Sequence, residues 1–184
     1  MNQLKILLTI ASLSYFSTLS QAEAITPQKC KVSFLTRARP VSISIEGMAK
    51  SNCQGSLNVE RGKVANSVFK LSMLDLDTGI ELRNKHLRDN YLTTKEFPEA
   101  KIEITSAANI DNQLAGKGAA ADAFEGTLTL RGMRHSISGT YTIKAGKLVA
   151  NFDVEMEDYG MKRPSFMGVI IVAGIGVKVE MYIK

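Results

Sequence analysis

The sequence predicts an all-β protein with one short helix, and a closed antiparallel barrel is the architecture that fits it most simply. Apolar residues occupy every second position in a series of short segments, and glycine-containing turns separate these segments. Only residues 78–91 change to a helical period. Because each strand pattern has one polar face, helices cannot cover both sides of the sheet, and closing the sheet removes its exposed edges. A two-sheet sandwich fits the same pattern and remains an alternative.

The alternation defines about nine strands, the first of them at residues 32–35. Successive side chains of a strand point to opposite faces, so apolar residues at every second position mark a half-buried strand. In chain order these apolar positions are Val41, Ile43 and Ile45; Leu57 and Val59; Phe69, Leu71 and Met73; Ile102 and Ile104; Phe124, Leu128 and Leu130; Ile137, Tyr141 and Ile143; Leu148, Ala150, Phe152, Val154 and Met156; and Ile175, Val177, Val179, Met181 and Ile183. Such a barrel encloses either packed side chains or one slender ligand, and the pattern does not distinguish them.

Residues 78–91 have the spacing of a short amphipathic helix that begins after Asp77 and ends before Pro98. We expect Asp77 or Thr78 to cap the backbone N–H groups of its first turn. Asp75 and Asp77 flank Leu76 and point the same way along a strand, so a shared cation or proton is the alternative role for this pair.

Residues 1–24 have the three-part layout of a secretory signal peptide. One lysine precedes the apolar run ILLTIASLSYF, and small or polar residues follow it. This run is shorter than the ~18 apolar residues of a membrane-spanning helix, and no later stretch reaches that length. We expect cleavage after Ala22 or Ala24, and one domain, residues 25–184, in the periplasm or outside a bacterial cell. A buried N-terminal strand or helix is the alternative.

Composition argues against several classes of partner. The 184 residues carry 23 Lys and Arg against 18 Asp and Glu, and the chain has no Trp. The positive charges are not clustered, and few aromatic rings are present to stack on bases, so we expect no nucleic-acid partner. Two Cys and two His would all be needed for one four-ligand zinc cluster, so we expect neither a metal nor a cofactor. In an oxidising compartment Cys30 and Cys53 most simply form a disulfide, with two separate thiols as the alternative.

Catalytic chemistry has little support in the residue pattern. His86 lies among apolar neighbours in the expected helix, which favours packing or capping over a role as general base. His135 lies in a polar turn. We therefore expect no catalytic residue and a protein that is not an enzyme.

Flexible apolar side chains point instead to binding. Met156, Met161 and Met167 lie close together in the chain, and thioether side chains adapt to irregular apolar shapes such as a long hydrocarbon. Ordinary core packing explains the same residues. Residues 169–173, VIIVA, are apolar at every position, so both faces of this segment need cover from a ligand, a dimer partner or the helix.

Several motifs resemble the YceI-like family of secreted bacterial proteins. The most specific string runs from Asp77-Thr78-Gly79 through Arg83 and His86-Leu87-Arg88 to Phe97-Pro98 before a strand. Two further matches are Phe124-Glu125-Gly126-Thr127-Leu128-Thr129-Leu130-Arg131-Gly132, and Ile45-Glu46-Gly47 with Gln54-Gly55-Ser56-Leu57. Arg134-His135-Ser136 stands where the family usually has a Lys-Pro-like pair, and the two cysteines are not a general family feature. The resemblance covers about residues 32–184.

The resemblance implies a lipocalin-like barrel of eight antiparallel strands with a helix across part of it, and an internal tunnel that holds a polyisoprenoid or isoprenoid quinone. It carries over no catalytic residue. We expect the apolar lining to include Phe69, Leu71, Met73, Ile102, Ile104, Leu128, Leu130, Phe152, Val154 and Met156. Candidates to meet a polar head group are His86, Tyr91 and Tyr159.

The leading hypothesis is thus an exported protein that sequesters or carries a long-chain isoprenoid lipid, such as a polyprenol or isoprenoid quinone. One alternative is a side-chain-filled barrel that docks a protein partner, or a second copy of itself, through VIIVA. Another is an isomerase or lyase for a small hydrophobic substrate, which requires His86 or the Asp75 and Asp77 pair to face a cavity.

Overall fold

Antiparallel strands curl around one elongated interior in the computed structural model, which describes residues 23–40, 43–118, 120–166 and 168–183. The strands are β1 (Glu23–Ile25), β2 (Lys29–Arg39), β3 (Ile43–Ala49), β4 (Gln54–Glu60), β5 (Lys63–Val64), β6 (Ser67–Ser72), β7 (Leu76–Asp77), β8 (Glu99–Ala107), β9 (Asp122–Leu130), β10 (Met133–Lys144), β11 (Lys147–Glu155), β12 (Ser165–Phe166), β13 (Val169–Ile171) and β14 (Gly174–Tyr182). The helical elements are α1 (Glu81–His86), η1 (Leu87–Tyr91), α2 (Ile110–Leu114) and η2 (Met156–Tyr159). Residues 1–22, most of the predicted signal peptide, lie outside the described residues.

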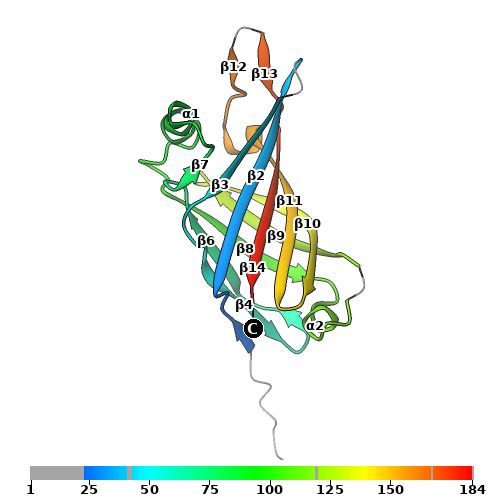
Figure 1. Cartoon of the computed structure of the whole chain (residues 1–184). Coiled ribbons are helices and arrows are strands. Elements are labelled where there is room, and N and C mark those ends of the chain that lie inside the picture. The colour runs from blue at the N-terminus through cyan, green and yellow to red at the C-terminus, as the bar shows by residue number, and fades with distance from the viewer. Residues whose placement is uncertain (1–22, 41–42, 119, 167, 184) are drawn as a thin grey trace, which may run out of the picture.

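The sheet follows the order β4-β6-β8-β9-β10-β11-β14-β2, with β3 paired to the far side of β2. Neighbouring strands are antiparallel, and the chain ends β2 and β14 lie side by side in register from Leu35 opposite Gly176 to Lys29 opposite Tyr182 (Figure 1). The N-terminal and C-terminal parts of the chain therefore meet near the β3 end of the strand order. The prediction of an all-β, lipocalin-like architecture with a short helix is confirmed.

The expected closure at eight strands is wrong, because the sheet is a half-barrel with a seam between β3 and β4. The described residues of these two strands do not pair with each other. Only a two-residue ladder, Met48 with Asp77 and Ala49 with Leu76, joins β3 to β7. The chain leaves regular strand geometry after Ser72 and resumes it at Leu76, where the sequence alternation slips. That interruption stops the strand before a full ladder with β3 can form.

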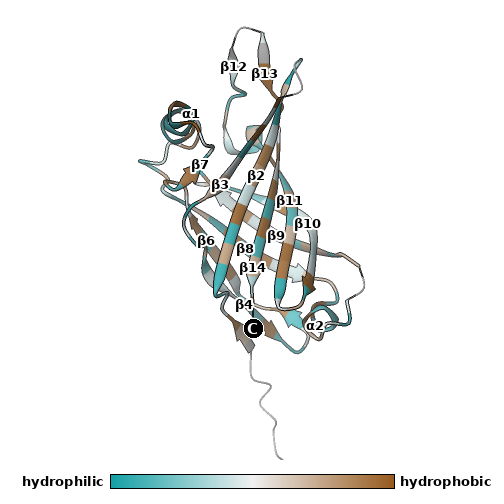
Figure 2. Cartoon of the chain, viewed as in Figure 1, coloured by the Kyte–Doolittle hydropathy of each residue, from teal (hydrophilic) through white to brown (hydrophobic). Residues whose placement is uncertain are grey.

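Alternating side chains give the sheet an apolar inner face and a polar outer face. Along β9, Phe124, Leu128 and Leu130 are buried, whereas the polar residues between them lie nearer to solvent. Brown and teal bands alternate along β2, β14 and β11 for the same reason (Figure 2). The core is therefore the concave side of one curved sheet.

Helix α2 closes the lower end of the half-barrel. Ile110 is 1% exposed, and Gln113 is fully buried with three hydrogen bonds. Gln113 Oε1 accepts from the Ile143 N–H at 2.8 Å, while Nε2 donates to Ala120 O at 2.8 Å and to Asp122 Oδ2 at 2.7 Å. One side chain thus fixes α2 against β10 and the segment that leads into β9.

Helix α1 lies at the other end of the molecule, near the β12–β13 hairpin (Figure 1). Its N-cap is Ile80, without a side-chain cap, so the expectation that Asp77 or Thr78 caps the helix is wrong. Asp77 Oδ1 accepts instead from the Gly79 N–H at 2.9 Å, and this contact stabilises the turn before the helix.

The predicted disulfide between Cys30 and Cys53 is confirmed. Their Cα atoms lie 5.5 Å apart, and the bridge joins β2 to the loop between β3 and β4. Cys30 is 4% exposed. The crosslink therefore holds the β3–β4 loop beside the open seam between β3 and β4.

Candidate functional site

A cavity of about 1110 Å³ runs inside the half-barrel. Its walls come from every long strand of the sheet and from α1, η1 and α2. Ligand pockets for drug-sized molecules typically measure about 300–1,000 Å³. The space therefore suits a ligand larger or longer than that class.

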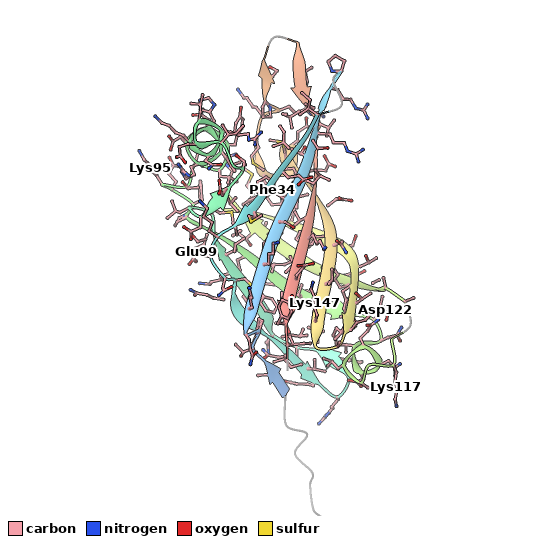
Figure 3. The ribbon with its side chains drawn as sticks, in the orientation of Figure 1. Phe34, Lys95, Glu99, Lys117, Asp122 and Lys147 are labelled. Carbon is pink, nitrogen blue, oxygen red and sulfur yellow. A yellow bond between two sulfur atoms is a disulfide. The ribbon has the colours of Figure 1, made fainter. Side chains whose placement is uncertain are left out.

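All ten side chains that the sequence predicts for an apolar lining face this cavity. They are Phe69, Leu71, Met73, Ile102, Ile104, Leu128, Leu130, Phe152, Val154 and Met156. Phe34 joins them from β2, and its ring occupies the place that a Cβ of residue 47 would need, so Gly47 makes room for it (Figure 3). The structure brings these side chains together; their contact with a ligand remains a prediction.

The cavity opens beside α1 and the β12–β13 hairpin. Ile80 and Leu82 line it and yet are 53% and 64% exposed, as expected for side chains at a mouth. Pro164, Ser165 and Ile171 line the opposite side. At the other end of the cavity Ile110 of α2 belongs to the lining and is 1% exposed, so α2 covers that end of the tunnel.

Polar side chains of the lining gather on the helical side of this mouth. Arg83, His86, Asn90 and Tyr91 all belong to it. Arg83 Nε donates to Thr78 Oγ1 at 2.9 Å and its Nη2 donates to Thr78 O at 2.5 Å, which orients the guanidinium. His86 and Tyr91 were expected at the site, but Arg83 was not. Arg83 belongs to the same motif, and its three-residue spacing from His86, which places both on one helix face, was the one signal that could have indicated it.

Tyr159 does not line the cavity. It is 1% exposed, lies edge-on to His135 with ring centroids 5.1 Å apart, and its buried hydroxyl has no hydrogen-bond partner among the described residues. Burial raises the pKa of Tyr159 to about 12. We therefore leave Tyr159 out of the residues that could meet a head group.

The charged side chains that line the cavity, among the described residues, are cationic. Lys70 and Arg83 line it, whereas no Asp or Glu side chain does among the described residues. The carboxylate of Asp77, in the turn before α1, accepts hydrogen bonds from the Gly79 N–H and from Asn84 Nδ2 and lies 3.0 Å from Lys50 Nζ. These contacts, the Gly79 hydrogen bond foremost, hold the pKa of Asp77 well below its usual range. These partners engage both oxygens of Asp77, Oδ1 through Gly79 and Asn84 and Oδ2 through Lys50, so this carboxylate holds the turn before α1 instead of sharing a cation or a proton with Asp75.

The described residues contain no cluster of three or more His, Cys, Asp or Glu side chains that could hold a metal ion. None of the helices in the described part of the chain has the length and apolarity that a membrane-spanning helix requires. What the arrangement can do is remove a long apolar chain from water.

Comparison with known proteins agrees with this geometry. The structure resembles Burkholderia cenocepacia BcnA with a TM-score of 0.62 at 14% identity, covering 83% of this chain and 94% of that one. It resembles a polyisoprenoid-binding domain from Saccharophagus degradans implicated in plant cell wall breakdown with a TM-score of 0.62 at 14% identity, covering 88% and 98% of the two chains. The structure also resembles the YceI protein of Campylobacter jejuni, with a TM-score of 0.52 at 16% identity, covering 77% of this chain and 88% of that one.

At these identities the likeness establishes the fold. None of the curated proteins matches the sequence. The model of the YceI-like domain matches residues 24–184, nearly the whole part of the chain that the structure describes. The chain therefore belongs to the YceI-like domain family.

Proposed function

We propose that this protein is an exported carrier that sequesters one long-chain isoprenoid lipid, a polyprenol or isoprenoid quinone, in its tunnel. The observation that carries the proposal is the cavity of about 1110 Å³, with mostly apolar walls and a mouth beside α1. Each buried methylene contributes about 0.8 kcal/mol, so a chain of several isoprene units binds tightly without any hydrogen bond. The Saccharophagus degradans domain of the same fold, described as polyisoprenoid-binding, supports this class of ligand.

The polar end of the ligand would remain at the mouth. Arg83, His86 and Tyr91 stand there, and each can donate a hydrogen bond to a hydroxyl, carbonyl or phosphate oxygen. Among the described residues, no carboxylate lines the interior beyond them to recognise a cation. Binding without chemistry is the function we infer, because no nucleophile, base and orienting group converge among the described residues that line the tunnel.

Export is the second part of the proposal. Strand β1 pairs with β4 through Glu23 opposite Val59, Ala24 opposite Asn58 and Ile25 opposite Leu57. Cleavage after Ala22 would keep this strand, whereas cleavage after Ala24 would remove two of its three residues. We therefore infer that the mature chain starts at Glu23, which an intact mass of the periplasmic protein tests. The Cys30–Cys53 disulfide supports an oxidising compartment.

The test of the ligand is organic extraction of protein purified from its native host, followed by mass spectrometry. We expect a prenyl lipid in an amount comparable to the protein. Repeated extracts without lipid, or extracts that contain only straight-chain fatty acids, would overturn the isoprenoid proposal. A gel-filtration mass of twice the monomer together with lipid-free extracts would favour the protein-docking alternative.

A further inference from the structure

The mouth of the tunnel is surrounded by side chains that a water-soluble surface would not normally expose. Ile43 and Ile170 are 55% and 48% exposed, and Ile80 and Leu82 are more than half exposed. We call these four residues the apolar rim. They come from three separate parts of the chain, β3, β13 and the start of α1. They meet at one end of the molecule because the fold brings these parts together, since the four residues are not neighbours in one apolar stretch of sequence.

Two members of the rim follow from sheet register. Ile43 lies opposite Ala38, which is 3% exposed, so both side chains lie on the inner face of the sheet. Ile45, two residues further along the same face, lines the cavity. Ile43 is thus the continuation of the tunnel wall beyond the mouth. Ile170 lies opposite Arg39, so its side chain is on the outer face of the β13–β2 ladder, whereas Ile171, opposite Ala38, lines the cavity.

Cationic side chains surround the apolar rim. Arg37 and Arg39 end β2, Lys162 and Arg163 precede β12, and Arg83, Lys85 and Arg88 lie on the helical side. The same segments carry four carboxylates, Glu81, Asp89, Glu157 and Asp158, of which Glu81 pairs with Arg88 and Glu157 pairs with Arg163, each at 2.8 Å. Asp77, also beside the mouth, pairs with Lys50 at 3.0 Å. Within the described residues no salt bridge involves Arg37, Arg39 or Lys162. The mouth therefore carries an excess of positive charge.

An apolar patch inside a ring of cations matches one partner in both respects, the surface of a bilayer that contains anionic phospholipid. The headgroups attract Lys and Arg, and exposed Ile and Leu side chains enter the boundary between headgroups and acyl chains. A protein partner would have to supply an acidic ring and an apolar centre of the same size. The tunnel opens at the centre of this surface, so a docked molecule would present its mouth directly to the membrane.

We propose that the apolar rim and its ring of cations are a membrane-docking surface, through which the tunnel exchanges its lipid with an anionic bilayer. This inference rests on the proposed function as a lipid carrier, but docking itself does not need a bound lipid. It predicts a reversible, salt-sensitive association, because exposed charges act over a Debye length of about 8 Å at physiological ionic strength.

The experiment is co-sedimentation of the mature, disulfide-bonded chain with vesicles of phosphatidylcholine alone or of phosphatidylcholine mixed with phosphatidylglycerol. We expect sedimentation with the mixed vesicles only, and release by salt. Each Lys or Arg near an anionic surface changes partitioning about fivefold, so the double variant Arg39→Glu, Lys162→Glu should weaken binding at least about twentyfold. Ile170→Asn should weaken it as well.

Matched controls lie at the closed end of the barrel. Lys63→Glu with Lys117→Glu makes the same charge change near α2 (Figure 3), and Tyr182→Asn removes an exposed apolar side chain at the end of β14. These controls should bind vesicles like the wild type. None of the rim substitutions in the test lines the cavity, so extracted lipid should stay at the wild-type amount.

Equal vesicle binding by the rim variants and the controls, or no binding of the wild type to mixed vesicles, would overturn the docking proposal. So would conversion of a dimer to a monomer by Ile170→Asn, because a second copy would then cover the rim. Lipid in the extract without vesicle binding rejects docking and leaves the carrier function intact. Vesicle binding with lipid-free extracts rejects the carrier function instead.

Discussion

Asn84 Nδ2 donates a hydrogen bond to Asp77 Oδ1 at 2.7 Å, and this contact ties helix α1 to β7 beside the mouth of the tunnel. Asn84 Oδ1 accepts from the Thr78 N–H at 2.7 Å and from Thr78 Oγ1 at 2.6 Å. Asn84 is 4% exposed, so its amide replaces the missing helix cap as the anchor of α1. The position of the mouth therefore depends on one carboxylate and one amide.

Acid should loosen this anchor. The lowered pKa of Asp77 means that folding favours its ionised form. That stabilisation is fully present above the pKa of about 3.9 in the unfolded chain and is lost as pH falls towards the lower value in the folded chain. We predict that Asp77→Asn lowers the thermal midpoint at pH 7 and that its difference from wild type shrinks below about pH 4. Asp89→Asn, in the same segment, is the control; a constant difference across pH would contradict the assignment.

Reduction should destabilise the fold measurably. The Cys30–Cys53 bridge spans 23 residues, and the loop-entropy relation gives roughly 3.4 kcal/mol for a loop of this size. We predict that reductant lowers the free energy of unfolding of the wild type, measured by urea denaturation, by about this amount. Cys30→Ser with Cys53→Ser should unfold at the reduced midpoint in either condition. A wild type indifferent to reductant would show that the bridge does not constrain the unfolded chain.

The closed end of the tunnel should depend on Gln113. Gln113→Leu leaves the Ile143 N–H without its acceptor in a buried site, and an unsatisfied buried group costs about 1–3 kcal/mol. Loss of the two hydrogen bonds from Nε2 adds to this, so we predict a destabilisation at or above the upper end of that range. Chemical denaturation measures it. Asn112→Leu, exposed on the same helix, should change stability little, and equal effects of the two substitutions would contradict the role of Gln113.

Sequence alternation located the tunnel wall well and the ends of the tunnel poorly. Leu128 and Phe152 could be assigned to the inner face because a strand has a fixed period of two. The seam beside β3 could not be predicted, because it depends on whether Met48 and Ala49 find partners across the barrel, and such long-range pairing leaves no periodic signal.

The mouth combines long-range contacts in the same way. Residues 169–173 were expected to be covered on both faces, yet β13 turns Ile171 into the tunnel and leaves Ile170 exposed. Tyr159 was expected at the head group, but η2 directs it against His135. Arg83 was not singled out because its orientation depends on Thr78, a contact formed only after the turn folds.

The central claim is that the tunnel itself holds the lipid chain, and filling it tests that claim most directly. Ala150 lines the cavity, whereas Ala123 is exposed on the outer face of β9, so Ala150→Phe and Ala123→Phe add the same group to opposite sides of the sheet. We would strip each protein of lipid and titrate it with a labelled polyprenol. The account predicts one lipid per chain for the wild type and Ala123→Phe, and at least about tenfold weaker binding for Ala150→Phe, since a ring in the tunnel displaces several methylenes at about 0.8 kcal/mol each. Unchanged binding by a folded Ala150→Phe would show that the lipid chain lies elsewhere.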